Sequence, residues 1–327
     1  MVPLSVTVAL AVALVMGDPA GAPGPASAAV LLLAVVTVGI PHGALDSAVS
    51  AVVDREPRAR YRRLRTHALA LVGAAAAWVV APVVALLGFV ALSAWHFGRS
   101  DLGPSGSDTA LARLREVTWG AAVLAAPIGL HAADAAAVIE HLGIGGVVRD
   151  ALVRVGPGMA AAAAGTHVAV RLWAWWVGDG LTPAAGFRAL AVHPAGVAAL
   201  AVVLVVADPL VGFACYFALW HAAAHLGGAI TFLQDHRVTL RPALRPALVD
   251  GLVPTLALGA AALAWPAVRT PTGLAALSFV ALSALTVPHV GVVEKMLAAT
   301  RIPQPDPAPV PRSPSRPVGW RSRPARR

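Results

Sequence analysis

The chain has 327 residues, of which 58% are hydrophobic and 13% are charged, and its mean hydropathy is +0.74. Soluble globular domains carry roughly 45–50% apolar and about 25% charged residues. Its polar residues are too few to cover the surface of a water-soluble fold of this size. Composition therefore excludes an ordinary soluble enzyme or a nucleic-acid-binding module, and it predicts an all-α, polytopic bundle of transmembrane helices.

The net charge of +9 does not indicate a nucleic-acid partner, because much of it belongs to the C-terminal end. Residues 302–327 are rich in Pro and Arg and offer no apolar face to bury. We expect this segment to be a disordered cytoplasmic tail near anionic lipid, and residues 1–301 to form one transmembrane domain. The single cysteine, Cys215, excludes an intrachain disulfide and a thiolate-bound cluster.

Apolar runs predict the membrane spans in chain order. The first run, Pro3 to Met16, lacks the positively charged start of a signal peptide, and we interpret it as a short first span. Since a span needs roughly 20 apolar residues, the chain has room for about eight to ten. The further runs lie at about 28–53, 67–81, 82–98, 116–140, 151–177, 189–207, 209–233, 246–268 and 272–298.

Basic loops predict the orientation of the bundle. Six arginines lie between Asp54 and Thr66, and smaller basic groups occur at 99–115, at 237–245 and in the tail. By the positive-inside rule these segments lie in the cytoplasm, which predicts a multi-pass protein of the cell membrane.

Eleven histidines in so apolar a chain need an explanation, since ionisable groups inside a membrane are costly. His167, four residues before Arg171, is expected to face a water-filled crevice. Five others fall at run ends or loops, where we expect structural roles: His67, His131, His141, His193 and His236.

The remaining five histidines predict a metal site. His221 and His225 are spaced i and i+4, so one helical face presents both imidazoles, as two ligands of one metal require. His42, His96 and His289 come from separate segments. Each lies shortly before a basic segment, which predicts that all of these histidines lie in the cytoplasmic half of the bilayer. Imidazoles without a cysteine suit Zn, Cu, Fe or Ni. The alternative for the paired histidines is packing or hydrogen bonding between helices.

Carboxylates and prolines accompany these histidines. Asp46, Asp101 and Glu294 follow them by four or five residues and are expected to orient an imidazole through its second nitrogen, or else to bond a helix end or basic loop. Pro41 and Pro288 each remove a helix hydrogen bond beside a histidine.

Aromatic residues lie close to the same histidines in the sequence. They predict a cavity for a flat, apolar, lipid-soluble substrate, with ordinary core packing as the alternative. The candidate lining residues are Trp95, Phe97, Phe213, Tyr216, Phe217 and Trp220.

Four motifs, in order, resemble the histidine motifs of the Brp/Blh family of integral membrane β-carotene dioxygenases: GIPHGALD, WHFGRSD, YFALWHAAAH and VPHVGVVE. The resemblance runs from about Val38 to Met296. One departure is the alanine-rich stretch 222–224, where a more polar residue is expected after the first histidine of the pair.

The resemblance implies oxidative cleavage of the central double bond of β-carotene with O₂, giving two retinal molecules at a non-haem Fe(II). It implies His42, His96, His221 and His225 as iron ligands, with His289 as an alternative ligand. The substrate would be taken from the lipid bilayer, and the retinal could pass to an opsin.

Two other classes of function are weighed against this one. A diiron membrane desaturase or hydroxylase needs several HxxxH and HxxHH boxes, whereas this chain has one HxxxH box and no HH pair. A transporter or binding protein for carotenoid or metal would need acidic residues inside its spans for ion coupling. The candidates Asp134, Asp208 and Asp250 all lie near span ends, which favours the enzyme.

Overall fold

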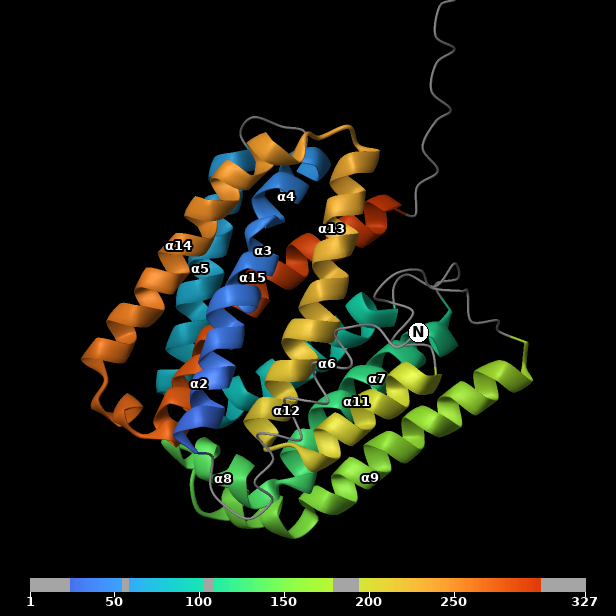
Figure 1. Ribbon diagram of the computed structural model, residues 1–327, viewed down its shortest axis with the longest axis vertical. Helices are drawn as coiled ribbons and strands as arrows, with labels where there is room; N and C mark the ends of the chain where they lie inside the picture. The colour runs from blue at the N-terminus through green and yellow to red at the C-terminus, as the bar shows by residue number, and fades with distance from the viewer. Residues whose placement is uncertain (1–23, 55–58, 103–108, 179–193, 301–327) are drawn as a thin grey trace, which may run out of the picture.

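The computed structural model describes residues 24–54, 59–102, 109–178 and 194–300, and every regular element within these ranges is a helix (Figure 1). The expected first span and the Arg/Pro-rich tail lie outside the described residues. In chain order the elements are α2 (Pro25–Ala34), the π-helix η1 (Val35–Gly39), α3 (Ile40–Ala44), α4 (Asp46–Asp54), α5 (Ala59–Val80), α6 (Pro82–Leu102), α7 (Ala110–Leu130), α8 (Ala132–His141), α9 (Val147–Trp176), α11 (Pro194–Val206), α12 (Pro209–Cys215), the π-helix η2 (Tyr216–Ala222), α13 (Ala223–Asp235), α14 (Leu240–Ala264), the 3₁₀ helix η3 (Pro266–Arg269) and α15 (Pro271–Thr300).

The all-helical membrane fold expected from composition is confirmed. Four described stretches are long and apolar enough to cross a membrane: Pro25–Asp54, Pro82–Leu102, Pro209–Asp235 and Pro271–Thr300. The pair α7 and α8 meets the same criterion together, but a 93° bend separates the two helices.

Among the described residues, four or five stretches thus meet this criterion of length and composition, and the expected first span lies outside them. Three further runs correspond to shorter apolar stretches of 10–17 residues: Ala68–Val80 in α5, Ala195–Val206 in α11 and Pro254–Ala264 in α14. Helix α9 has the length of a span, but polar residues such as His167 and Arg171 lower its hydropathy. The expected basic loop also differs, because its residues from Ala59 onward are the first turns of α5.

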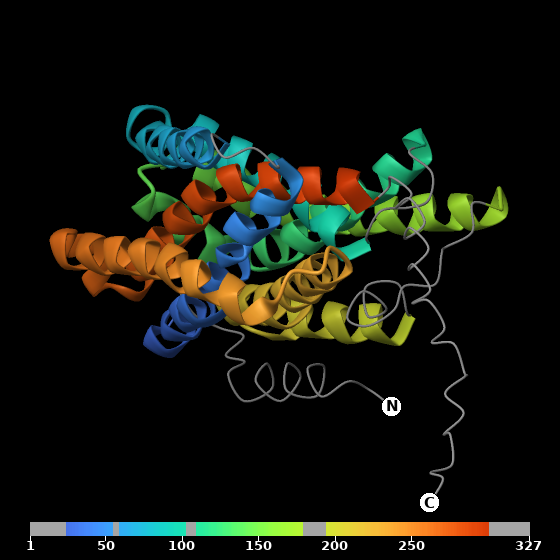
Figure 2. The same ribbon diagram turned by 90° about the horizontal axis from the view of Figure 1, so that it is seen from above.

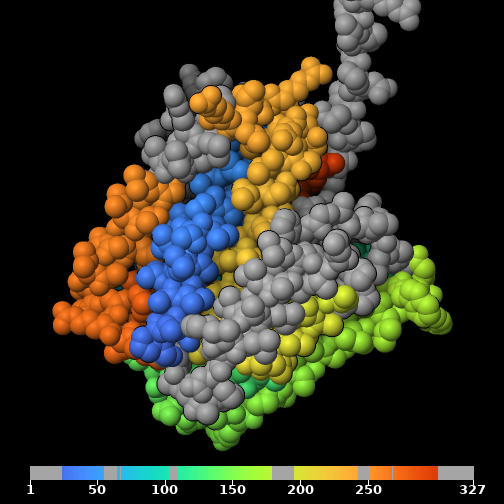
Figure 3. All heavy atoms as spheres, in the orientation of Figure 1, coloured from blue at the N-terminus to red at the C-terminus, as the bar shows by residue number. Residues whose placement is uncertain are grey.

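The helices surround the segment that holds the first histidine motif. Helices α2, α3 and α4 run between α14 and α13 on one face of the molecule (Figures 1 and 3). Helix α15 packs against α2, α4 and α5. Helix α9 lies on the side of the bundle away from α14 and packs against α7 (Figures 1 and 2). Segments from both ends of the chain therefore meet in the interior.

Glycines let three helices approach at backbone distance. A Cβ atom added to Gly98 would lie 1.8 Å from the carbonyl oxygen of Glu116, and one added to Gly120 would lie 1.9 Å from that of Ala94. These contacts join α6 to α7. A Cβ atom on Gly129 would likewise lie 2.3 Å from the carbonyl oxygen of Gly156, which joins α7 to α9. Small residues permit such close packing in membrane bundles.

Candidate metal centre

The five histidines of the predicted site lie together in the interior of the bundle. They come from five different elements: His42 from α3, His96 from α6, His221 from η2, His225 from α13 and His289 from α15. All are buried, with at most 7% of their surface exposed. Their ring centroids are separated by 4.8 Å for the closest pairs and 6.4 Å for the widest recorded pair, His96 and His225.

These separations fit rings arranged around one ion. With a metal–imidazole bond of about 2.1 Å, as for zinc, the centroids of rings sharing one ion would lie about 4.5–6.5 Å apart. The separations are 5.8 Å from His42 to His221, 5.5 Å from His42 to His225, 4.9 Å from His96 to His221 and 5.0 Å from His96 to His289. The cluster therefore has the dimensions of a metal site.

Unpartnered nitrogen atoms also support a metal site at this cluster. The Nε2 atoms of His96, His221 and His289 are buried and make no hydrogen bond. Buried polar atoms are nearly always hydrogen-bonded, so three such nitrogens in one cluster require a common partner. A metal ion bound by neutral imidazoles is a partner of this kind.

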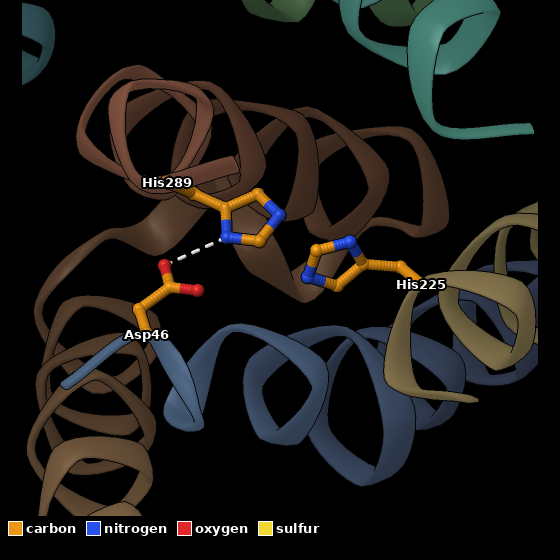
Figure 4. A group of neighbouring side chains, drawn as sticks. All are labelled: Asp46, His225 and His289. Atoms are coloured by element: carbon orange, nitrogen blue, oxygen red, sulfur yellow. Dashed lines mark hydrogen bonds and ion pairs between the residues drawn. The ribbon is translucent and has the colours of Figure 1, made fainter. Parts of the chain in front are cut away.

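Asp46 fixes the ring of His289. Its Oδ2 atom lies 2.7 Å from His289 Nδ1, and the other nitrogen of that ring points away from the carboxylate (Figure 4). Asp46, His225 and His289 each offer a ligand atom within 4.8 Å of the others. Because the Asp46 oxygen accepts the Nδ1 proton, we interpret Asp46 as the residue that orients His289 and leaves its Nε2 available.

Asp101 fixes the ring of His221 in the same way. Its Oδ1 atom lies 3.0 Å from His221 Nδ1, while its Oδ2 atom accepts hydrogen bonds from Tyr216 at 2.7 Å and Trp119 at 2.9 Å. The carboxylate is 2% exposed, so these three donors satisfy it away from water. The Nδ1 atom of His42 bonds the carbonyl oxygen of Gly39, which fixes that ring as well.

Comparison with known proteins identifies the family of the chain. The profile of the family described as β-carotene 15,15'-dioxygenase matches residues 33–297, a range that includes all five histidines. The chain belongs to this family. It is also 32% identical, over 301 aligned residues, to a Halobacterium salinarum protein named as a probable β-carotene 15,15'-dioxygenase, Blh. That alignment covers 81% of this chain and 83% of the relative. No solved structure matches.

In this β-carotene dioxygenase family member, two π-helical turns position the histidines. Helix η1 ends at Gly39, immediately before the segment Ile40–Ala44 that carries His42, and η2 contains His221. A π-turn adds one residue to a helical turn and often occurs at functional sites. The sequence analysis expected only the prolines to disturb these helices, whereas Pro288 lies inside the continuous helix α15.

Aromatic side chains of the predicted set pack around the histidines of this dioxygenase. The Phe97 ring lies 4.4 Å from that of His221, and the Phe217 ring lies 5.6 Å from that of His42. Phe213 stacks on Phe217 at 5.9 Å. The remaining members are Tyr216, which bonds Asp101, Trp220, whose buried indole nitrogen has no partner, and Trp95, which bonds Glu294.

Glu294 was expected to orient an imidazole, but it pairs with an arginine instead. Its carboxylate accepts two hydrogen bonds from Arg99, at 2.8 and 3.0 Å, and one from Trp95 at 3.2 Å. Arg99 also donates to the buried Glu116 at 3.0 Å. Glu294 therefore joins α15 to α6 and, through Arg99, to α7. Asp46 and Asp101 also do not bond the histidines nearest to them in the sequence, since each bonds a histidine of another helix.

The sequence analysis missed Trp119, Arg99 and Glu116. A signal was present for the two charged residues, because ionisable groups within or beside apolar runs are costly unless paired. Of the histidines expected to be structural, His131, His141 and His236 do lie at helix ends. The side chain of His67 and the whole of His193 lie outside what is described.

Proposed function

We propose that this protein cleaves the central double bond of β-carotene with O₂ and releases two molecules of retinal, at a non-haem Fe(II) held by histidines. In this reaction one carbon–carbon double bond breaks and two carbonyl bonds form, so each oxygen atom ends in one retinal. The observation that carries the proposal is the convergence of five buried imidazoles, three of them with an unpartnered Nε2, in a β-carotene dioxygenase family member.

The proposed ligands are His42, His96, His221 and His225, with His289 as the alternative ligand. The donor set is nitrogen alone, which suits iron among the first-row metals. Bound there, the iron would supply the redox chemistry with O₂.

The chain's own residues position and protect the reactants. Asp101 and Asp46 hold the Nδ1 protons of His221 and His289, which keeps these rings oriented and leaves Nε2 free for the metal. Phe97, Phe213 and Phe217 offer apolar faces that suit a flat polyene and exclude water, with Trp95, Tyr216 and Trp220 as further lining residues. No protein nucleophile is needed.

The location of the site inside a helical membrane fold supports a substrate drawn directly from the lipid bilayer. We further propose that the protein resides in the cell membrane, with the basic segments and the tail at 302–327 in the cytoplasm. Residues 1–301 would then form the catalytic domain, and retinal leaving it could be delivered to an opsin.

The test is expression in cells that accumulate β-carotene, followed by chromatography of the extracted pigments against an empty-vector control. We expect retinal to appear as carotene disappears. Confirmed membrane expression with unchanged carotene would instead favour a carotenoid-binding or transport role. For the metal, purified protein treated with a chelator should lose activity and regain it with Fe²⁺ but not with Zn²⁺.

A further inference from the structure

A group of charged and aromatic side chains lies about one helical turn beyond the histidines, where α6 packs against α15. It consists of Trp95, Arg99 and Glu294, with Glu116 of α7 as a further partner. Arg99 is 7% exposed and Glu116 is 2% exposed, whereas the side chain of Glu294 is 36% exposed. Neither the proposed ligand set nor the proposed reaction uses these three charges.

The ion pair between Arg99 and Glu294 joins the same two helices as a pair of histidines. The rings of His96 on α6 and His289 on α15 lie 5.0 Å apart. Arg99 follows His96 by three residues, or about 4.5 Å along its helix, and Glu294 follows His289 by five, or about 7.5 Å. Both steps run toward the C-terminal ends of their helices. Helices α6 and α15 are therefore in contact at two successive levels.

The contact between Arg99 and Glu294 has a defined geometry. The Nε atom of Arg99 donates to Glu294 Oε1 at 2.8 Å, and its Nη2 atom donates to Oε2 at 3.0 Å. Two parallel bonds of this kind fix both the distance and the angle between the guanidinium and the carboxylate. Trp95, the residue before His96, donates to Glu294 Oε1 at 3.2 Å, and its ring lies 5.1 Å from Arg99 Cζ.

The guanidinium of Arg99 is also held from α7. Its Nη1 atom donates to Oε2 of the buried Glu116 at 3.0 Å. The backbones of the two helices meet at the same place, since a Cβ atom added to Gly98 would lie 1.8 Å from the carbonyl oxygen of Glu116. Arg99 is thus fixed on the α6–α7 pair, and Glu294 connects α15 to that pair.

We propose that Arg99 and Glu294 are positioning residues that hold His96 and His289 at the separation that one metal ion requires. Each acts through the helix that carries its histidine and touches neither the metal nor the substrate. Asp46 already bonds His289 Nδ1 and sets the rotation of that ring. Glu294 instead sets where α15 places the ring relative to α6. This inference rests on the proposed iron site.

Glu294→Gln tests the proposal at the more exposed member of the pair. The glutamine has nearly the same shape, but its one oxygen accepts only one of the two Arg99 bonds, and its NH₂ group faces the other N–H. Arg99 keeps its ion pair with Glu116, so no buried charge is left without a partner. The variant should therefore fold, and its metal binding can be compared directly with that of the unaltered chain.

Purified full-length protein in detergent is freed of metal with a chelator and titrated with Fe²⁺ without O₂. We expect Glu294→Gln to bind iron about 10-fold more weakly, as loss of a group that supports a metal ligand typically causes. Co²⁺ bound in place of iron reports ligand geometry through its visible absorption, and these bands should shift in the variant. Arg99→Lys should shift them too, because lysine keeps the charge but loses the planar donors.

Lys295→Gln is the matched control. Lys295 is the next residue of α15, and its ion pair with Asp54, at 2.9 Å, lies at an exposed position. This variant should keep the iron affinity and the Co²⁺ spectrum of the unaltered chain. Unchanged affinity and spectrum in Glu294→Gln, or equal changes in Lys295→Gln, would overturn the positioning role alone. Failure of the unaltered chain to bind iron would overturn the proposed iron site, and this inference with it.

Discussion

The Oδ1 atom of Asp101 lies 3.0 Å from Nδ1 of His221, although 120 positions separate the two residues. The same carboxylate accepts hydrogen bonds from Tyr216 and Trp119, so it links α6, α7 and η2. One buried acid thus connects the packing of three helices with the orientation of a proposed iron ligand. Its replacement tests whether that connection matters for the metal.

Asp101→Asn should lower iron affinity and retinal formation by about 10- to 100-fold, as loss of a group that orients a metal ligand typically does. One amide oxygen cannot accept from all three donors, so the amide NH₂ would face either the His221 Nδ1 proton or the Tyr216 and Trp119 protons. Iron titration of purified protein measures the effect. Asp150→Asn, at an exposed position in the first turn of α9, should leave iron binding unchanged. Equal affinities in the two variants would count against a role for Asp101.

His221→Ala and His225→Ala should each abolish retinal formation, because each removes a proposed ligand from a buried cluster. His236→Ala should leave turnover largely intact, since that ring lies at the end of α13, where its Nδ1 bonds the neighbouring backbone carbonyl of Phe232 at 2.8 Å. Pigment analysis after carotene-accumulating expression compares the three. Equal losses in all three would refute the proposed ligand set.

Arg99→Gln should destabilise the protein by about 3–5 kcal/mol, because it removes the buried guanidinium that pairs with both Glu116 and Glu294. Thermal unfolding in detergent measures the change in melting temperature. The control is Arg149→Gln, since the pair of Arg149 and Glu140 is half exposed and contributes about 0–1 kcal/mol. A melting temperature as high in Arg99→Gln as in the control would show that the buried network adds no stability.

Gly120→Ala should also lower the melting temperature, since its Cβ atom would lie 1.9 Å from the backbone oxygen of Ala94. The helices α6 and α7 would have to separate, which would move Trp119 relative to Asp101. We expect a loss of iron together with the loss of stability. The control is Gly88→Ala in α6. Nothing lies within 4 Å of the Cβ atom added there, so this substitution should be tolerated or slightly stabilising. Unaltered stability in Gly120→Ala would contradict the backbone contact.

Much of the helical organisation was predictable from composition and apolar runs. The bounds of the later helices agree closely, as with the run at 272–298 and helix Pro271–Thr300. Whether an apolar run forms one straight helix was not predictable in this way, because hydropathy does not reveal whether a helix bends, as α7 and α8 do by 93°. Nor does it reveal that part of a basic loop continues a helix, as in α5.

The sequence by itself determined that the protein is helical and apolar, and it singled out five histidines, because burying an imidazole in an apolar run is costly and needs a reason. Only the tertiary structure decided which carboxylate serves which ring: Asp46 bonds His289 and Asp101 bonds His221. It also assigned Glu294 to Arg99. Such pairings depend on how separate helices cross, and backbone contacts at particular glycines set that crossing. The spacing of residues along the chain therefore does not predict which side chains pair.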